Sequence, residues 1–391
     1  MNLSNRVAIV SMAQFNYSEK RAYSPEELAY QAIRPVLQET GLRFTPAYEK
    51  GGIDASLICH EHSRIARPFS ASLVVDVAGA NLRPDEKVDQ DGAVGVLEAM
   101  WQIASGEFDT VLVVAVGQDS TAAGAGNAIE NKVFDPFFMR PLGLDNVQAA
   151  ALQANRYAHR YGLTPEHFAA ISVKNLGNAI HHPLALRSGH YSTADVLASK
   201  RLADPITALQ TRAFGDSAIV MLLASEQRAK QLTDKPVWIK GAANCCDGYF
   251  LGDRDLSECE VLRMASEKAY RMAGITDPRS EIDLIELTDE FSYQELMTYE
   301  GLGLCEAGDG IRWLDSGASR SNGRQPVNLS GGALAGCSHT TIGMGRIAEI
   351  FLQLRGEAGG RQVDKARTGL AQLASGPAGQ FQQVMVLGTT P

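Results

Sequence analysis

Three short segments of the chain carry side chains that could do acid-base chemistry. His60 and His62 are two positions apart after an apolar stretch, so on a strand both imidazoles would face the same side. Asp289 and Glu290 follow a second apolar stretch, where burial would raise a carboxyl pKa toward that of a general base. His339 lies in a glycine-rich segment. We predict general acid-base catalysis, with structural histidines and an ion pair between Glu290 and an arginine as the alternatives.

Cysteines and tyrosines are weaker candidates. Cys337 and Cys59 could be nucleophiles, although free cysteine is more often a small buried packing residue. Three tyrosines could be general acids or could simply pack with a satisfied hydroxyl: Tyr249, Tyr293 and Tyr299. The six cysteines have irregular spacing and form no Cys-x-x-Cys pair, which predicts reduced thiols. Two histidines without a third close ligand make a poor metal site, so we expect no metal.

Composition excludes several classes of function. The 391 residues are 45% apolar and 21% charged, and Lys+Arg minus Asp+Glu is 36 − 45 = −9. This mild acidity disfavours general binding to nucleic acid or to an anionic membrane, while a local basic patch could still receive a phosphorylated ligand. The longest apolar runs have the length of a strand, far short of the ~20 residues of a membrane helix. With no apolar signal at its N-terminus, the chain is expected in the cytoplasm.

The elements that must position these side chains repeat weakly between two halves of the chain. Each half opens on an apolar strand, followed by a helix, Pro25–Thr40 or Glu260–Ala273, that ends in a glycine. In each half a second strand follows, then a buried helix (92–107 or 342–357) and finally an apolar closing strand (110–116 or 383–388). The order β, α, β, α, β, repeated twice, predicts a five-layer αβαβα body.

The first half carries an insertion that the second half lacks. We divide the chain into residues 1–229, with an inserted loop region at about 118–215, and residues 230–391. The insertion contains a Gly/Ala-rich loop at 122–127, an aromatic stretch at 134–138 and two helical segments at 146–161 and 165–180. Long insertions of this kind usually shape a substrate mouth or an oligomer contact.

The motifs resemble those of thiolases. The segment Asn328-Leu-Ser-Gly-Gly, continued by Gly-Cys-Ser-His339-Thr-Thr-Ile-Gly-Met-Gly345, is similar to the thiolase loop Asn-Pro-x-Gly-Gly…Gly-His-Pro-x-Gly-x-x-Gly. Residues 285–304 resemble the Glu-Leu-His-Asp-Cys-Phe-Ser-x-x-Glu-Leu strand and helix of sterol-carrier-protein-linked thiolases. The resemblance runs in order along almost the whole chain. It implies an α/β thiolase fold of two duplicated βαβαβ halves.

The same resemblance shows that the catalytic cysteines of thiolases are replaced. Gly92 is at the position of the nucleophile, and Thr288 and Glu290 replace a histidine and a cysteine of the second half. Thiolysis through an acyl-cysteine is therefore not expected. In the family, the residue matched by His339 polarises a carbonyl or helps to activate the nucleophile. We expect the substrate to be bound by the backbone and side chains of this loop and of the nucleophile position: Gly92, Asn328, Gly331 and Gly332.

These replacements point to carbon–carbon bond chemistry without thiolysis. The chain resembles cysteine-less relatives, among them the steroid side-chain aldolases, which implies retro-aldol cleavage of a β-hydroxyacyl-CoA in lipid or steroid metabolism. It also resembles thiolase-like C-acyltransferases with a histidine in the segment of His60 and His62, a segment that the pseudo-twofold symmetry would bring opposite Asp289. The alternatives are a non-catalytic subunit that binds acyl-CoA or scaffolds a complex, and an acyltransferase using Cys337 or Cys59.

The resemblance also implies partners. Coenzyme A would enter as part of the substrate, with no bound cofactor. We expect a homodimer that pairs through the strand following Gly92 and covers residues 71–80, and a small zinc-ribbon/OB-fold partner protein. Neither nucleic acid nor membrane is expected to bind.

Overall fold

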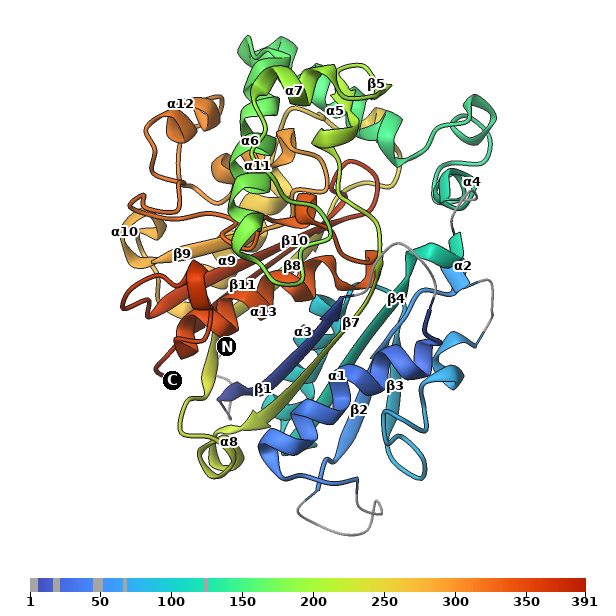
Figure 1. Ribbon diagram of the computed structural model, residues 1–391, viewed down its shortest axis with the longest axis vertical. Coiled ribbons are helices and arrows are strands. Elements are labelled where there is room, and N and C mark those ends of the chain that lie inside the picture. Colours follow the sequence, from blue (N-terminus) through green and yellow to red (C-terminus); the bar gives the residue numbers. More distant parts are fainter. Residues whose placement is uncertain (1–5, 17–21, 45–51, 66–68, 123–125) are drawn as a thin grey trace.

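A computed structural model describes residues 6–16, 22–44, 52–65, 69–122 and 126–391. Nine strands of these ranges form one sheet in the order β3-β2-β4-β7-β1-β8-β11-β10-β9. Their bounds are β1 Val7–Asn16, β2 Ala55–Cys59, β3 Asp85–Val88, β4 Thr110–Gln118, β7 Asp216–Ser225, β8 Val237–Cys246, β9 Leu284–Leu287, β10 Thr368–Ser375 and β11 Phe381–Gly388. The two halves join where β1 pairs with β8 over a short register (Figure 1).

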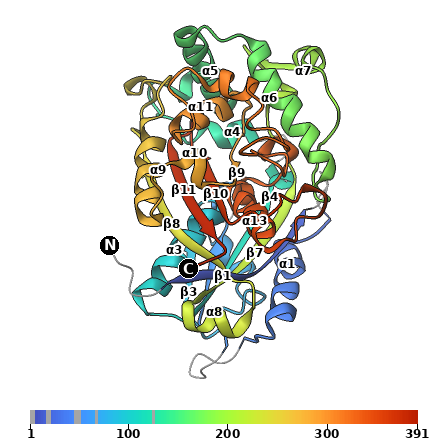
Figure 2. The ribbon, with the colours of Figure 1, turned by 90° about the vertical axis from the view of Figure 1, so that its left-hand side faces the viewer.

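Helices cover both halves of the sheet and also separate them, so the predicted five-layer thiolase fold is confirmed (Figures 1 and 2). Helix α3 (Gly92–Ser105) and helix α13 (Ile342–Arg355) contact each other in the central layer, in a core to which strands of both halves contribute. On the outer faces, α1 (Pro25–Thr40) packs on β1, β4 and β7, and α9 (Glu260–Ala273) packs on β8 and β11. The shorter helices α8 (Glu226–Leu232), α10 (Pro278–Glu281), α11 (Tyr293–Gly301) and α12 (Gly310–Asp315) complete the body.

Local signals fix the helix ends. The capping box of Ser24 and Glu27 begins α1, and Gly41 and Gly274 end α1 and α9 in the left-handed conformation. The predicted bounds of both helices are therefore confirmed. The prediction of two buried helices at 92–107 and 342–357 is confirmed as well, because most residues of α3 and α13 are buried.

The predicted correspondence between the closing strands of the two halves is wrong. We matched the strand beginning at Thr110, which is β4, with the strand at 383–388, which is part of β11. In the structure β4 lies parallel to β2 as β10 lies parallel to β9, so β4 corresponds to β10. The strand of the first half that corresponds to β11 is β7, because β7 is antiparallel to β4 as β11 is antiparallel to β10. Each half therefore ends in two antiparallel strands, a detail that an apolar run cannot reveal because it carries no information on strand direction.

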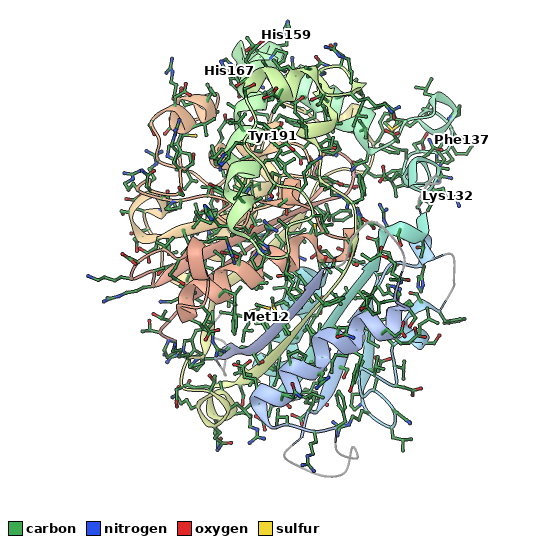
Figure 3. All side chains as sticks on the ribbon, viewed as in Figure 1. Met12, Lys132, Phe137, His159, His167 and Tyr191 are labelled. Atoms are coloured by element: carbon green, nitrogen blue, oxygen red, sulfur yellow. The ribbon has the colours of Figure 1, made fainter. Side chains whose placement is uncertain are left out.

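The insertion between β4 and β7 is mostly helical. Its elements are α4 (Gly126–Asn131), α5 (Asn146–Tyr161), α6 (Pro165–Asn178), α7 (Thr193–Ala198) and the hairpin of β5 (Arg201–Ala203) with β6 (Ile206–Thr207). The helix predicted at 146–161 is confirmed, while residues 123–125 of the predicted Gly/Ala-rich loop lie outside the described ranges. Lys132 and Phe137 stand at the outer edge of this insertion, and Phe137 is exposed (Figure 3).

The strand expected to pair two subunits is internal. The strand that follows Gly92 is β4, and both of its edges are occupied, by β2 and β7. The described part of residues 71–80 forms a 3-10 helix and turns rather than a strand edge. The edge on this side of the sheet is β3, which precedes Gly92. None of the helices in the described ranges combines the length and apolar character needed to cross a bilayer.

Candidate active site

Two adjoining cavities lie near the carboxyl ends of the parallel strands, where α/β sheets usually bind ligands. The smaller has a volume of about 410 Å³ and the larger about 1050 Å³. Four residues line both cavities: Arg64, Glu130, Asn146 and Glu290. Segments that follow β2, β4 and β9 thus meet residues of α4 and α5 from the insertion. Residues of the insertion therefore line both cavities, while the choice between a substrate mouth and an oligomer contact stays a prediction.

Glu61 and His339 form the central polar pair of the smaller cavity. His339 Nε2 lies 3.2 Å from Glu61 Oε1, and Arg64 Nε donates to Glu61 Oε2 at 3.1 Å. Glu61 comes directly after β2, and His339 comes from the loop before α13. The fold therefore brings one acid-base group from each half of the chain to a single cavity.

Burial sets the protonation of this pair. It lowers the pKa of His339 well below its ordinary value, and the Arg64 and Arg212 guanidinium groups lower it further. It raises the pKa of Glu61 to about 7, against the opposing effect of Arg64 and with a further increase from Asp119. His339 is consequently neutral at pH 7, and Glu61 can hold or release a proton there.

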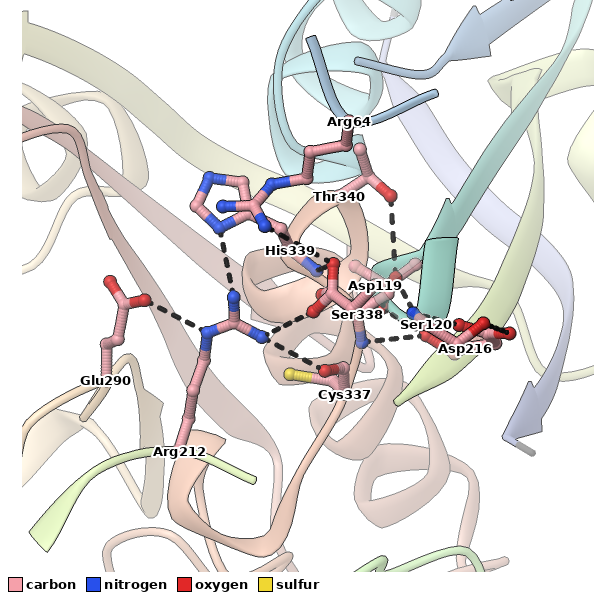
Figure 4. Close-up of polar contacts among 12 residues, drawn as sticks. Arg64, Asp119, Ser120, Arg212, Asp216, Glu290, Cys337, Ser338, His339 and Thr340 are labelled. Carbon is pink, nitrogen blue, oxygen red and sulfur yellow. Dashed lines mark hydrogen bonds and ion pairs between the residues drawn. The ribbon is translucent and has the colours of Figure 1, made fainter. Parts of the chain in front are cut away.

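Arg212 connects His339 to the acidic residues of the site (Figure 4). Its fully buried guanidinium donates to Asp119 Oδ2 at 2.8 Å and to Glu290 Oε1 at 2.9 Å, and its Nη2 lies 3.3 Å from His339 Nδ1. Asn146 donates to the other oxygen of Glu290 at 3.2 Å. Glu290 is therefore ion-paired with Arg212, as the alternative to a catalytic role predicted, and it lies where the two cavities meet.

Gly92 begins α3, at the helix N-terminus expected for a nucleophile, and the space beside it is filled. A Cβ atom added there would lie 2.4 Å from Met344 Sδ and 2.6 Å from the Ala115 Cβ. The preceding Asp91 accepts hydrogen bonds from the backbone N–H groups of Ala93, Gly343 and Met344. One carboxylate thus caps the N-termini of both central helices.

The Gly-Gly turn surrounds a buried carboxylate. A Cβ on Gly332, whose φ is +67°, would lie 2.2 Å from Asp289 Oδ1, and the Ala333 N–H donates to that oxygen. Burial raises the pKa of Asp289 to about 8. Asn328 joins the turn to β9 by accepting from the Leu287 N–H at 2.8 Å. Four of the predicted site residues therefore form a buried cluster and line neither of the two larger cavities: Asp289, Asn328, Gly331 and Gly332.

His60 and His62 do not share a strand, so that prediction is wrong. Strand β2 ends at Cys59 and His62 begins the short helix α2 (His62–Ile65). His60 is buried with its Nδ1 3.3 Å from the Ser70 carbonyl oxygen, and burial lowers its pKa to about 4. His62 Nε2 lies 2.8 Å from Lys87 Nζ. Neither histidine lines the two cavities, and neither contacts Asp289.

The cysteine and tyrosine candidates also lie apart from the cavities. No cysteine is among the described residues that line either one. Cys337 is buried, and burial raises the pKa of its thiol to about 12. Tyr293 donates to Gln153 and Tyr299 to Glu295, as packed tyrosines with satisfied hydroxyls do, while Tyr249 is exposed. Within the described ranges, no group of three or more His, Cys, Asp or Glu side chains could hold a metal ion.

Sequence reasoning missed several residues of the site, among them Glu61, Arg64, Asp119, Asn146 and Arg212. On a strand Glu61 would face the side opposite to its neighbouring histidines, but the chain leaves the strand at Cys59, before Glu61. Its position directly after β2 was the available signal, because catalytic residues often follow the carboxyl ends of parallel strands. Arg212 had no local signal, since its partners come from three distant segments.

Comparison with known proteins agrees with this fold. Residues 244–389 match the family described as "Thiolase C-terminal domain-like". Two solved structures share the fold: the Ltp2-ChsH2(DUF35) aldolase, with a TM-score of 0.83, 22% identity and coverage of 100% of this chain and 99% of that chain, and the monomeric SCP2-thiolase like protein type 1 of Mycobacterium smegmatis, with a TM-score of 0.74, 20% identity and coverage of 98% and 77%.

Sequence relatives extend the match over the whole chain. Human sterol carrier protein 2 is 36% identical over 225 residues, which are 55% of this chain and 40% of that protein. The acetyl-CoA acetyltransferase of Methanothermobacter thermautotrophicus is 30% identical over 380 residues, which cover 95% of this chain and 97% of that enzyme. With a relative aligned from end to end on a fold of two related halves, the chain belongs to the thiolase superfamily.

Proposed function

We propose that the protein is an acyl-CoA lyase that cleaves a β-hydroxyacyl-CoA by a retro-aldol reaction. The observation that carries this proposal is the Glu61–His339 pair, 3.2 Å apart, in a cavity of about 410 Å³ whose described lining holds no thiol. An acyl-cysteine route needs a thiolate in the cavity. A retro-aldol route needs a base for the hydroxyl proton and hydrogen-bond donors for the thioester enolate.

The residues of the junction can supply both needs. Glu61 takes the proton of the β-hydroxyl group, and the oxygen electrons form the C=O bond of the departing aldehyde or ketone as the Cα–Cβ bond breaks. The electron pair of that broken bond forms the thioester enolate. Arg64 and Asn146 line both cavities and carry N–H groups suited to stabilise that oxyanion. Glu61 then returns the proton to the enolate carbon, which yields the shortened acyl-CoA and regenerates the carboxylate. The adjoining larger cavity has room for the pantetheine arm.

Turnover of a panel of β-hydroxyacyl-CoA substrates by the purified protein, assayed both alone and with a coexpressed small zinc-ribbon/OB-fold protein, tests the proposal. We expect a carbonyl product and a shortened acyl-CoA, identified by mass spectrometry, and a loss on the order of 10²- to 10⁴-fold in Glu61→Gln. Glu27→Gln is the matched control, because the exposed capping box of α1 accepts glutamine at that position. Equal turnover by Glu61→Gln and the wild type would contradict the proposed base.

Two alternatives predict different results. An acyltransferase using Cys337 or Cys59 would gain an acyl group on the intact protein after exposure to acyl-CoA, and the name of the archaeal acetyltransferase relative favours this chemistry. Both thiols are buried, and burial raises their pKa values, which disfavours the thiolate. A non-catalytic subunit would bind acyl-CoA without converting any substrate, with or without a partner protein.

We also propose that the protein works in the cytoplasm as a homodimer with a small zinc-ribbon/OB-fold partner. The printed name of the similar Ltp2-ChsH2(DUF35) aldolase contains a second component, which supports a partner, and the edge strand β3 offers unpaired backbone groups for a dimer. The free cysteines suit a reducing compartment. A clean monomer in light scattering at micromolar concentration would contradict the dimer. Activity in the panel assay that needs no second protein would contradict the requirement for a partner.

A further inference from the structure

The hydrogen bonds of Arg212 indicate which ring nitrogen of His339 carries the proton. A guanidinium group has only donors, so His339 Nδ1, 3.3 Å from Arg212 Nη2, must be an acceptor in that contact. The imidazole is neutral, and its single ring proton is therefore on Nε2. That nitrogen lies 3.2 Å from Glu61 Oε1. A protonated Nε2 has no free lone pair for a proton of the substrate, and protonation of Nδ1 instead would place a cation beside two arginines.

Asp119 holds both partners of this contact in place. Its Oδ2 accepts from Arg212 Nη1 at 2.8 Å, and its Oδ1 accepts from the His339 backbone N–H at 3.3 Å. Arg212 also donates to Glu290 and to the carbonyl oxygen of Cys337, the latter at 3.2 Å. Because the buried guanidinium is held by these contacts as well as by Asp119, its geometry toward His339 is fixed (Figure 4).

We infer that Arg212 is a positioning residue that holds His339 in the Nε2–H tautomer and so makes Glu61, not His339, the proton acceptor of the site. The catalytic part rests on the proposed retro-aldol function, whereas the tautomer is a property of the resting protein. During the reaction His339 keeps its ring proton and donates it as a hydrogen bond to Glu61. The hydroxyl proton moves to Glu61 when the Cα–Cβ bond breaks and then moves to the enolate carbon.

The tautomer can be measured without any substrate. In protein labelled with ¹⁵N-histidine, the resonances of His339 are those missing from His339→Gln, and we expect an unprotonated Nδ1 and a protonated Nε2. Arg212→Lys keeps a positive charge between Asp119 and Glu290 but lacks the planar set of donors, so Nδ1–H should become populated. The control is Arg361→Lys, a buried arginine paired with Glu349 that lines neither cavity, and it should leave the His339 signals unchanged.

A double-mutant cycle separates positioning from a general structural effect. On the β-hydroxyacyl-CoA identified in the panel, Arg212→Lys should lower kcat on the order of 10²-fold in the wild-type background. In the His339→Gln background the amide N–H can donate to Glu61 and no tautomer needs to be fixed, so Arg212→Lys should cost little more. The same loss in both backgrounds, or an Nδ1–H signal in the wild type, would overturn the inference. If the wild type cleaves no substrate, the proposed function fails and the spectrum alone decides the role of Arg212.

Discussion

Restoring the thiolase nucleophile should damage the fold rather than restore thiolysis. In Gly92→Cys the new Cβ would lie 2.4 Å from Met344 Sδ and 2.6 Å from the Ala115 Cβ, against the ~3.5–4.0 Å of a normal carbon contact. Met344 can change its rotamer, but Ala115 is in the fully buried strand β4 and cannot move away. Overpacking of this kind costs about 1–3 kcal/mol, and the added sulfur makes the upper end of that range the expected loss.

Urea denaturation measures this loss as a lower free energy of unfolding. Gly92→Ala isolates the Cβ contact, and Gly345→Ala in α13 is the control, because a Cβ there would meet Ile219 at an ordinary 3.7 Å. We expect the control to be neutral or to gain up to about 1 kcal/mol, since alanine is the better helix former.

Thiolysis of acetoacetyl-CoA should remain undetectable in Gly92→Cys. The Asp91 carboxylate that caps α3 would disfavour the thiolate of the adjacent cysteine, and Glu290, at the position of the second thiolase cysteine, is ion-paired with Arg212. A stable Gly92→Cys variant with thiolase activity would refute the reasoning on both points.

Five further results are expected. The kcat/KM for the proposed substrate should fall as the pH is lowered through about 7, because the base is the unprotonated Glu61 carboxylate; a flat profile would contradict this. Because folding raises the pKa of Glu61, the protonated group stabilises the folded protein at low pH, and this contribution is lost as the pH rises from about 4.5 to about 7. Calorimetry of the wild type and of Glu61→Gln across this pH range measures the loss. Asp91→Ala should lower the free energy of unfolding by about 2–3 kcal/mol, since it removes the cap of two helices; a change below about 0.5 kcal/mol would refute the double cap. Gly332→Ala should lower the free energy of unfolding by about 2–4 kcal/mol, because it combines a left-handed φ with a clash against Asp289. His62→Ala should keep the turnover of the wild type, because His62 contacts Lys87 and lines neither cavity.

Much of the fold follows from local sequence signals. Periodicity and caps predict the bounds of α1, α5 and α9, because a helix is satisfied by hydrogen bonds within its own segment. Strand partners are less predictable. The apolar runs of β4 and β11 look alike, yet one lies between a parallel and an antiparallel neighbour and the other between two antiparallel ones. Direction and order in a sheet depend on distant segments, which an apolar run does not encode.

The sequence by itself determined that this chain has two thiolase-like halves and that a histidine lies in the glycine-rich loop of the second half. Only the tertiary structure decided which groups meet. It ends β2 at Cys59, which separates His60 from His62 and turns Glu61 toward His339. It also buries Asp289 inside the Gly-Gly turn. The physical reason is that hydrogen bonds and ion pairs between side chains depend on distances of a few ångströms between segments far apart in the chain, and only packing sets those distances.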